Sequence, residues 1–360
     1  MHDRMKRAWV EIDLGALRQN AAAIAQRAGT PLLPMVKADG YGLGAVTIAR
    51  ALEQLTPWGF GVATISEGVQ LREAGIERHV VVFTPLLQHE LADARRWRLT
   101  PCFGDALRLA RWHELGGARW QLSIDTGMNR DGVRWDQIDS MRESVLRAPP
   151  EGAFTHLHSA DLADGTAEMQ ERRFEEAISR LPARPPLLHA ENSAMIVRRA
   201  GSPWNLARPG IFIYGGSDTS AAPLHPLVVM KLRARIVDVR TVTAGETVSY
   251  GGTYRADGTR RIATVAMGYA DGYPRSLSNR GEAIVRGCRV PVAGIVNMDM
   301  TMVDVTNVPC DVGDVATFIG SDGDVSLSLD DVARRAGTIS YEVLTGLGRR
   351  LERVYAGGTP

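Results

Sequence analysis

The first 215 residues of the chain alternate between short apolar, β-branched runs and amphipathic helical segments. Such alternation favours parallel strands joined by crossover helices. An open doubly wound sheet is the competing arrangement, but its glycine-rich dinucleotide turn is missing. Eight strand–helix units in about 200 residues predict a closed (β/α)8 TIM barrel, an α/β fold. The eight expected strands are 32–36, 58–63, 79–84, 99–103, 119–125, 152–158, 186–190 and 205–215.

A helix is expected before the first barrel strand. Asp13 has the side chain of an N-cap residue, and Gly29 is a suitable stop signal. The clearest of the later helical segments are 44–55, 66–75, 90–98, 104–115 and 167–181.

The sequence pattern changes after about residue 220. Residues 217–226 are small, polar and proline-containing, which is typical of a linker. Short strand-like runs without intervening helices follow, and they predict a mostly β C-terminal domain. We therefore expect a barrel domain over residues 1–220 and a β domain over 221–360, with helices near 327–337 and 339–348.

Charge and cysteine usage exclude several classes of protein. The 42 basic and 41 acidic residues give a net charge of +1, so no bulk attraction to nucleic acid or a membrane is expected. Cys102, Cys288 and Cys310 are far apart and show no disulfide or metal-ligand spacing, which fits a reducing cytoplasm. No secretory signal and no apolar run of membrane-spanning length is found.

Polar residues directly after the expected strands are the first candidates for a site, because barrel enzymes place their chemistry at the carboxyl ends of strands. Lys37 follows the first strand and is flanked by Gly40, Gly42 and Gly44. A buried lysine amine loses its proton more easily and forms imines with aldehydes. A surface lysine at the start of a loop is the alternative. The other strand-end candidates are Arg130, His156, His158, His189, Asn192, Ser193, Arg208, Pro209, Gly210 and Ile211.

Some of these candidates also have simpler explanations. Ser193 opens a helix and Arg208 adds a cation beside exposed backbone, so together they could hold a phosphate. Alternatively, Ser193 is an N-cap and Arg208 an ion-pair partner. His156 could equally be a core histidine, and Tyr250, which lies between glycine-rich neighbours in the second domain, could be a packing residue.

With these residues collected, the chain resembles the alanine racemase family over essentially its full length. Nine segments match the family's motifs in order: WVEIDLGALRQN, MVKADGYGLG, IDTGMNRDG, FTHLHSAD, HAENSA, ARPGIFIYG, VSYGGTY, GYADGYPR and NMDMTMVDV. The resemblance implies an isomerase that interconverts L-alanine and D-alanine by two-base α-proton transfer with pyridoxal 5'-phosphate. It further implies a cytoplasmic homodimer with shared active sites that supplies D-alanine for peptidoglycan precursors.

The resemblance also implies a role for each matching residue. Lys37 would bind the cofactor covalently and take the α-proton of the D enantiomer, and Tyr250 of the other subunit would act on the L enantiomer. Arg208 would face the pyridine nitrogen with His189 behind it, and His156 would pack against the pyridine ring. Phosphate contacts are implied for Tyr41, Ser193, Gly210 and Ile211, and substrate contacts for Arg130, Met298 and Tyr269.

Two positions depart from the family pattern. Many members have a carbamylated lysine that braces the arginine seven residues later, but this chain has Ser123 there, so Arg130 must be held differently, for example by an anion. Where the family often has a tyrosine near the C-terminus, alignment places Arg349. Arg349 could bind phosphate as a cation or change the width of the pocket.

These departures keep other functions open. A serine or broad-specificity racemase of the same plan is one. A barrel-type pyridoxal-phosphate decarboxylase of basic amino acids would favour a glycine-rich phosphate loop and a catalytic cysteine in the second domain. Cys288 and Cys310 are present, but no such loop is found. A non-catalytic pyridoxal-phosphate-binding protein would resemble the barrel alone. No metal is expected.

Overall fold

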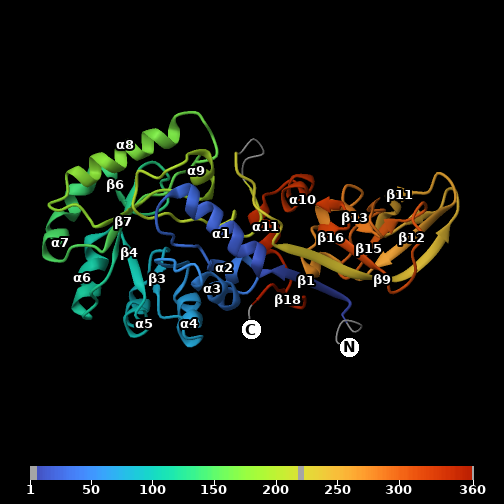
Figure 1. Cartoon of the computed structure of the whole chain (residues 1–360), viewed down its shortest axis with the longest axis horizontal. Helices are drawn as coiled ribbons and strands as arrows, with labels where there is room; N and C mark the ends of the chain where they lie inside the picture. Colours follow the sequence, from blue (N-terminus) through green and yellow to red (C-terminus); the bar gives the residue numbers. More distant parts are fainter. Residues whose placement is uncertain (1–5, 218–222, 359–360) are drawn as a thin grey trace. The chain divides into compact units, whose positions relative to one another are not determined.

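The computed structural model describes residues 6–217 and 223–358, which form two compact units (Figure 1). One unit comprises residues 18–213 and 217–225, and we call it the barrel unit. The other comprises residues 1–17, 214–216 and 226–360, and we call it the β unit. Residues 218–222 of the expected linker lie outside the described part of the chain.

The barrel unit contains the predicted parallel strands. Its sheet runs in the order β2-β3-β4-β5-β7-β8, and every pairing along it is parallel. All residues of β2, β4 and β5 are buried, as expected for parallel strands covered by helices. The strands are β2 (Gly59–Val62), β3 (His79–Val82), β4 (Thr100–Phe103), β5 (Gln121–Asp125), β6 (Val133–Arg134, beside β5), β7 (Gly152–Phe154) and β8 (Leu187–His189).

The first and last of the eight expected strands close the barrel through isolated bridges. Leu32 pairs with Ala207, and Met35 pairs with Gly61 of β2. Backbone hydrogen bonds continue on both sides, from Leu33 N to Ala207 O at 2.8 Å and from Val36 N to Gly61 O at 2.8 Å. The predicted (β/α)8 barrel is confirmed, although these two segments make less regular ladders than the other six.

Helices on the outside of the strands complete the barrel unit, as Figure 1 shows for α4, α5, α6 and α8. Each of the predicted helical segments forms. Several begin at a side-chain cap, including a capping box in which Thr64 and Glu67 satisfy each other's backbone N–H groups. The helices are α2 (Lys37–Tyr41), α3 (Ala45–Glu53), α4 (Ile65–Glu73), α5 (Leu91–Arg96), α6 (Ala106–Glu114), α7 (Arg142–Arg147), α8 (Thr166–Ser179) and α9 (Ser193–Arg198).

The N-terminal segment differs from the predicted domain division. Strand β1 (Ala8–Asp13) pairs with β9 (Met230–Val242) and with β18 (Glu352–Ala356), so it belongs to the β unit, whereas the prediction assigned residues 1–220 to the barrel. Helix α1 (Leu14–Ala28) follows, with Asp13 Oδ1 accepting from Ala16 N at 3.0 Å and Gly29 in the left-handed region. The helix is therefore as predicted, and the strand before it was missed.

The β unit is built on a mixed sheet in the order β14-β13-β16-β9-β1-β18. Strand β12 pairs with β9 and β15, and β17 pairs with β16. The remaining strands are β12 (Arg260–Val265), β13 (Glu282–Val285), β14 (Cys288–Pro291), β15 (Thr301–Asp304), β16 (Val315–Asp322), β17 (Val325–Leu327) and the hairpin β10 (Thr247–Val248) and β11 (Tyr254–Arg255). Two helices, α10 (Leu329–Ala336) and α11 (Ser340–Thr345), form where they were expected.

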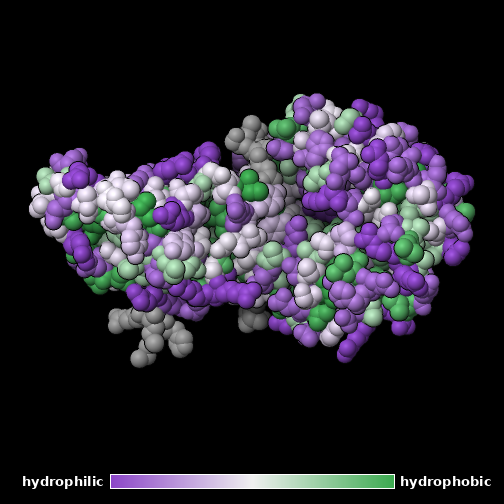
Figure 2. All heavy atoms as spheres, turned by 180° about the vertical axis from the view of Figure 1, so that it is seen from behind, coloured by the Kyte–Doolittle hydropathy of each residue, from purple (hydrophilic) through white to green (hydrophobic). Residues whose placement is uncertain are grey.

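On the face shown in Figure 2, hydrophobic residues occur in small groups among hydrophilic ones, which is ordinary for a folded chain. Within the described residues, no helix combines the length and the hydropathy needed to cross a bilayer.

Candidate active site

The segment after the first barrel strand is a left-handed turn. Ala38, Asp39, Gly40 and Tyr41 have φ angles of 52°, 53°, 60° and 54°. Left-handed backbone costs roughly 1–2 kcal/mol for each residue with a Cβ. Strain of this kind persists only where surrounding contacts hold it, and it is concentrated at functional sites. Lys37 stands at the start of this turn.

A carboxylate from helix α4 holds the strained turn. Glu67 Oε1 accepts a hydrogen bond from Ala38 N at 2.7 Å, while its Oε2 accepts from Ala63 N at 2.7 Å. Asp39 Oδ1 accepts from Ala45 N at 2.9 Å, at the first residue of α3. Glu67 thus ties the backbone next to Lys37 to the ends of β2 and α4.

The electrostatic surroundings of Lys37 favour its neutral amine. The side chain is exposed to solvent, yet the protein packed around the amine removes enough water to lower its pKa. The cations Arg130 and Arg208 lower the pKa further, and Glu67 opposes them. A lysine of this kind is a better nucleophile and base than a free one.

A buried hydrogen-bonded chain leads from Arg208 to the barrel strands. Arg208 Nη1 donates to His189 Nδ1 at 2.7 Å, and Arg208 Nη2 donates to Thr155 O at 2.7 Å. His189 Nε2 lies 3.2 Å from Gln121 Oε1. Because Nδ1 accepts from the arginine, the proton of the neutral ring belongs on Nε2. Burial and Arg208 keep the pKa of His189 well below its usual range, and burial lowers the pKa of Arg208 to about 10.

His156 shares the electrostatic environment of the other candidates. Burial, together with the positive charges of Arg208, Arg130 and Lys37, lowers its pKa to about 3. Its ring is therefore neutral at physiological pH. The structure brings Lys37, Arg130, His156 and Arg208 close enough to influence one another's charge.

The residues expected around a phosphate also come together. Ser193 Oγ accepts from Gly210 N at 2.9 Å, and Phe212 N lies 3.4 Å from the same oxygen. A Cβ placed on Gly210 would collide with Tyr41 Oη, so the tyrosine hydroxyl lies directly against the Gly210 backbone. Ser193, Tyr41 and Ile211 are all buried. The N-cap of α9 is Asn192, which accepts from Met195 N at 3.1 Å, so Ser193 is not the N-cap.

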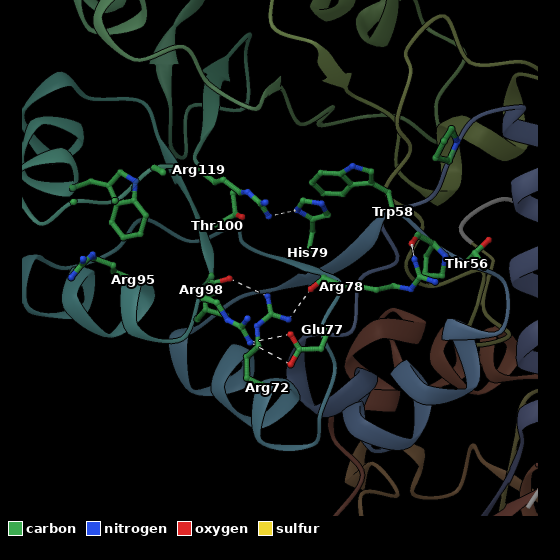
Figure 3. A pocket seen from close by; sticks show the side chains of 17 residues that line it. Thr56, Trp58, Arg72, Glu77, Arg78, His79, Arg95, Arg98, Thr100 and Arg119 are labelled. Atoms are coloured by element: carbon green, nitrogen blue, oxygen red, sulfur yellow. Dashed lines mark hydrogen bonds and ion pairs between the residues drawn. The ribbon is translucent and has the colours of Figure 1, made fainter.

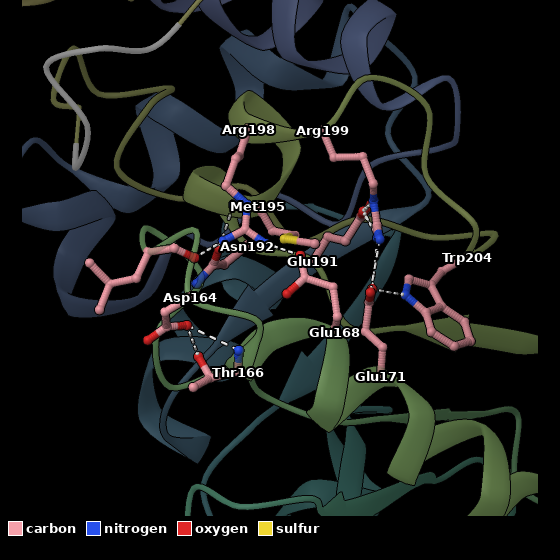
Figure 4. Close-up of polar contacts among 11 residues, drawn as sticks. Asp164, Thr166, Glu168, Glu171, Glu191, Asn192, Met195, Arg198, Arg199 and Trp204 are labelled. Carbon is pink, nitrogen blue, oxygen red and sulfur yellow. Dashed lines mark hydrogen bonds and ion pairs between the residues drawn. The ribbon is translucent and has the colours of Figure 1, made fainter.

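An ion-pair network fixes the loop that carries Ser193 (Figure 4). Arg199 Nη1 donates to Glu171 Oε2 at 2.8 Å, and Arg199 Nη2 donates to Glu191 Oε1 at 2.5 Å. Trp204 Nε1 donates to Glu171 Oε1 at 2.9 Å. Glu191 is almost fully buried, and its backbone oxygen accepts from Arg208 N at 2.9 Å. The network therefore positions both Ser193 and Arg208.

Arg130 lies on an exposed loop next to an acid that the sequence analysis did not single out. The Asp131 carboxyl group lies near Gly132 N, the Ser123 hydroxyl, Arg108 and Arg130. Burial raises the pKa of Asp131, while these donors and cations oppose the shift. The anion near Ser123 and Arg130 is thus the carboxylate of Asp131, a residue of the chain itself.

The remaining candidates lie in the β unit, mostly on exposed loops. Tyr250 is 72% exposed and follows Ser249, whose φ of 68° is left-handed. Ser249 Oγ lies 2.7 Å from Ile295 O and 2.9 Å from Asn297 Oδ1. Asn297 O in turn accepts from Tyr269 N at 3.0 Å. A single loop therefore holds the Tyr250 and Tyr269 segments.

Met298 and Arg349 also belong to this unit. Met298 is 53% exposed, and its backbone oxygen accepts from Ala270 N at 3.0 Å. Arg349 is exposed, and its side chain makes no hydrogen bond or ion pair with the residues that the structure describes. Its neighbour Arg350 is fully engaged, with Nε 2.6 Å from Asp271 Oδ1 and Nη1 2.8 Å from Asp299 Oδ1.

Comparison with known proteins identifies the family. The family model described as "Alanine racemase, N-terminal domain" matches residues 12–218, and "Alanine racemase, C-terminal domain" matches residues 229–355. The chain belongs to the alanine racemase family. Curated alanine racemases from Citrifermentans bemidjiense and Nostoc are 39% and 38% identical to it. Each alignment covers 97% of this chain. It covers 98% of the Citrifermentans protein and 96% of the Nostoc protein.

Solved alanine racemase structures have the same fold. The alanine racemase from Streptomyces coelicolor superposes with a TM-score of 0.92 at 31% identity, over 99% of this chain and 100% of that one. The Bartonella henselae alanine racemase, solved with covalently bound pyridoxal phosphate, gives a TM-score of 0.90 at 28% identity, over 98% of this chain and 100% of that one.

Several residues of this alanine racemase family member were missed at the sequence level. Glu67 had a detectable signal, since Thr64 and Glu67 have the spacing of a capping box. The small number of lysines also distinguishes Lys37, and the sequence analysis did not use it. The other lysines are Lys6 and Lys231, and neither follows a barrel strand. Asp131 and Gln121 carried no signal, because their roles depend on which side chains the fold brings next to them.

Proposed function

We propose that the chain interconverts L-alanine and D-alanine with pyridoxal 5'-phosphate as its cofactor. Membership of the alanine racemase family over nearly the whole chain supports the reaction. The single structural observation that carries the proposal is Lys37, an amine of lowered pKa at the start of a strained turn and close to Arg130 and Arg208.

The donor set at the mouth of the barrel fits this cofactor. Lys37 offers an amine for an aldehyde, and Arg208 offers a buried guanidinium for the ring nitrogen. The close approach of Tyr41 Oη to the Gly210 backbone, together with Ser193 Oγ and the backbone at Ile211, forms a small polar cradle suited to a phosphate. The neutral ring of His156 offers a face for the pyridine.

When bound, pyridoxal phosphate withdraws electrons from the substrate's Cα–H bond, which makes the α-proton acidic enough to remove. Racemisation then requires one base on each side of that carbon. Lys37 Nζ would take the proton of the D enantiomer and return one when the L enantiomer reacts. Tyr250 Oη would perform the same exchange on the opposite side.

The protonation of the two bases follows from their surroundings. Removal of water and the nearby arginines favour the neutral amine of Lys37 at neutral pH. A free tyrosine titrates near about 10, so the Tyr250 phenol needs donors or positive charge beside it to act as a base. Arg208 keeps its own proton, and its partner His189 is neutral, so this pair stabilises a ring nitrogen without protonating it. Such an arrangement limits side reactions such as transamination.

Substrate contacts and dimerisation complete the proposal. Arg130 would bind the substrate carboxylate, Met298 would offer its backbone N–H to the same group, and Tyr269 would line the entrance. Tyr250 would act in the site of the partner subunit of a homodimer. The high exposure of Tyr250 and Met298, at 72% and 53%, supports an interface at these loops. Arg349 would contact the cofactor phosphate or alter the pocket width.

A cytoplasmic location and a role in supplying D-alanine for peptidoglycan precursors complete the functional proposal. Free thiols at Cys102, Cys288 and Cys310 support a reducing compartment.

A chiral assay in deuterated water tests the function. Purified protein loaded with pyridoxal phosphate is incubated with L-alanine, L-serine and other amino acids, and both enantiomers and their deuterium content are measured. We expect D-alanine with deuterium at Cα, and slower reaction of serine. Faster reaction of serine would instead support the serine or broad-specificity racemase, for which the exposed Arg349 is the motivating residue. Cofactor binding without α-proton exchange would indicate the non-catalytic protein.

A further inference from the structure

A cavity of the barrel unit, apart from the candidate active site, has a volume of about 860 Å³ (Figure 3). Its lining includes residues 56–58, 77–79, 98–100 and 116–119, together with Arg72, Arg95 and Trp112. These residues precede or begin β2, β3, β4 and β5. Lys37, His156 and Arg208 follow their strands. Because the barrel strands are parallel, the cavity lies at the opposite end of the barrel from the candidate active site.

The lining is strongly cationic. Five arginines, Arg72, Arg78, Arg95, Arg98 and Arg119, line the cavity together with a single carboxylate, that of Glu77. Glu77 is already paired, since its Oε2 lies 2.9 Å from Arg98 Nη2. The side chains that line the cavity therefore carry more positive than negative charge. Outside this lining, Glu151 Oε1 lies 4.0 Å from Arg119 Nε.

Some of these arginines have structural roles. Arg72 donates to the backbone oxygens of Ile76 at 2.6 Å and Trp97 at 3.1 Å, in the loops that follow α4 and α5. Arg78 Nη1 donates to Pro57 O at 2.8 Å. Helix C-termini carry partial negative charge, so arginines that bind nearby carbonyl groups stabilise this end of the barrel. Arg72 and Arg78 are accounted for in this way.

Arg95 and Arg119 have no such role. The Arg95 guanidinium makes no hydrogen bond or ion pair within the described part of the chain and lies over Gly116. Arg119 has only long contacts, 3.4 Å to His79 Nδ1 and 4.0 Å to Glu151 Oε1. Figure 3 shows both side chains at this cavity. Two exposed guanidinium groups are thus available to an anion.

An aromatic pair also lines the cavity. The rings of Trp58 and His79 are stacked, with centroids 4.2 Å apart and planes 6° apart (Figure 3). Trp58 and His79 are only partly buried, so the pair can also offer an aromatic face to a ligand.

We propose that this cavity binds a small polyphosphate anion, of the class that contains pyrophosphate and the nucleoside di- and triphosphates. Guanidinium groups bind phosphate oxygens in a bidentate manner, and several adjacent phosphate groups match several arginines. The volume suits a ligand of nucleotide size and exceeds what a single phosphate needs. Arg95 and Arg119 bind the phosphates, and Trp58 and His79 form a wall for a base.

Calorimetric titration of the holoenzyme with pyrophosphate and with ATP tests the proposal. The cofactor linkage is first fixed by borohydride reduction and excess cofactor is removed, so that the phosphate cradle at the other end of the barrel is filled. We expect saturable binding of at least one probe. Arg95→Ala combined with Arg119→Ala should weaken that binding at least about tenfold, because two charge-assisted contacts are lost.

The matched control removes the same charge from exposed arginines outside the cavity. Arg111 and Arg147 pair with Glu114 and Glu143, and the Arg111→Ala/Arg147→Ala variant should bind like the wild type. A second measurement needs no variant: pyrophosphate or ATP should protect Arg95 and Arg119, but not Arg111, from modification by phenylglyoxal as read by mass spectrometry. Binding of neither probe, equal binding by the Arg95/Arg119 variant, equal loss in the control, or no selective protection would overturn the proposal.

Discussion

The candidate residues of the barrel and those of the β unit differ in how completely their surroundings are formed. In the barrel, Arg208, His189 and Ser193 are 5%, 0% and 4% exposed, and each is hydrogen-bonded to the barrel's own loops and strands. In the β unit, Tyr250 and Met298 are 72% and 53% exposed. Their backbones are fixed by local hydrogen bonds, while their side chains face solvent.

This contrast indicates which part of the site a single chain can complete. The barrel holds the groups proposed to bind the cofactor in place through burial and hydrogen bonding, and burial influences their protonation. The β unit presents Tyr250 on a loop fixed by hydrogen bonds, with the side chain exposed. The proposed dimer would place that side chain beside the partner's barrel.

Replacement of Lys37 should give the largest loss of activity. A small loss would contradict the view that the barrel unit supplies the essential groups of the site. In Lys37→Ala, racemisation should fall at least about 10³-fold, because both the cofactor's covalent anchor and one base are lost. The visible absorbance of the lysine-bound cofactor should vanish as well. Lys231→Arg, at a lysine of the β unit, is the control and should retain both. An unchanged absorbance spectrum in Lys37→Ala would reject Lys37 as the anchor.

Replacement of Glu67 sharpens the claim that the barrel positions its own groups. Glu67→Ala removes the acceptor of the Ala38 and Ala63 N–H groups beside a strained turn. We expect the free energy of unfolding to fall by about 1–3 kcal/mol, measured by chemical denaturation. Glu73→Ala, on an exposed position at the end of the same helix, should have little effect. Equal stability of the two variants would show that the turn does not depend on Glu67.

Acidification should affect the barrel through its buried neutral histidines. The pKa of His156 is about 3 in the folded chain, against an ordinary value of 6.5. Between these values the unfolded chain binds more protons, so the free energy of unfolding should fall as the pH falls from 6.5 towards 3. The slope approaches about 1.4 kcal/mol per pH unit for each such histidine.

Denaturation of His156→Asn at a series of pH values measures this contribution. The variant should show a shallower loss of stability below pH 6.5 than the wild type. His158→Asn, at the exposed histidine two residues later, should behave like the wild type. If His158→Asn changed the slope as much as His156→Asn does, burial of His156 would not be the cause.

The smallest expected effect concerns Asp131. Asp131→Asn removes a carboxylate that lies near both Arg130 and Ser123. Partly exposed ion pairs contribute up to about 1 kcal/mol, so KM for alanine should rise by a factor of up to about 5 with little change in kcat. Asp136→Asn, which breaks the exposed pair with Arg134, should leave KM unchanged. A large loss of kcat in Asp131→Asn would give Asp131 a different role.

The sequence predicted the regular parts of the fold well. Hydrophobic runs located the eight strands that form the barrel, because parallel strands are buried on both faces. The first and last of these form bridges rather than full ladders, since Pro34 and Pro209 have no N–H to donate. The two-residue strand β6 beside β5 was not predicted. Strand β1 was missed because its partners β9 and β18 are more than 200 residues away in the chain, and no local pattern reveals such pairing.

The candidate site, like the fold, has features that the sequence predicted and features that it did not. Motifs located Lys37, Ser193 and Arg208, which the fold brings to one end of the barrel. The left-handed turn at Ala38 and Asp39 could not be predicted, because residues with a Cβ rarely adopt that conformation without external support. That support comes from Glu67, 29 residues further along the chain.

The most direct test of the account follows α-proton exchange from each pure enantiomer separately. Tyr250→Phe, loaded with pyridoxal phosphate, is given L-alanine or D-alanine in deuterated water, and early loss of the α-proton is read by NMR. If Lys37 and Tyr250 serve opposite sides of one carbon, exchange from L-alanine should be abolished while exchange from D-alanine persists. Equal exchange from both enantiomers, at the rate of the unaltered protein, would contradict the two-base arrangement.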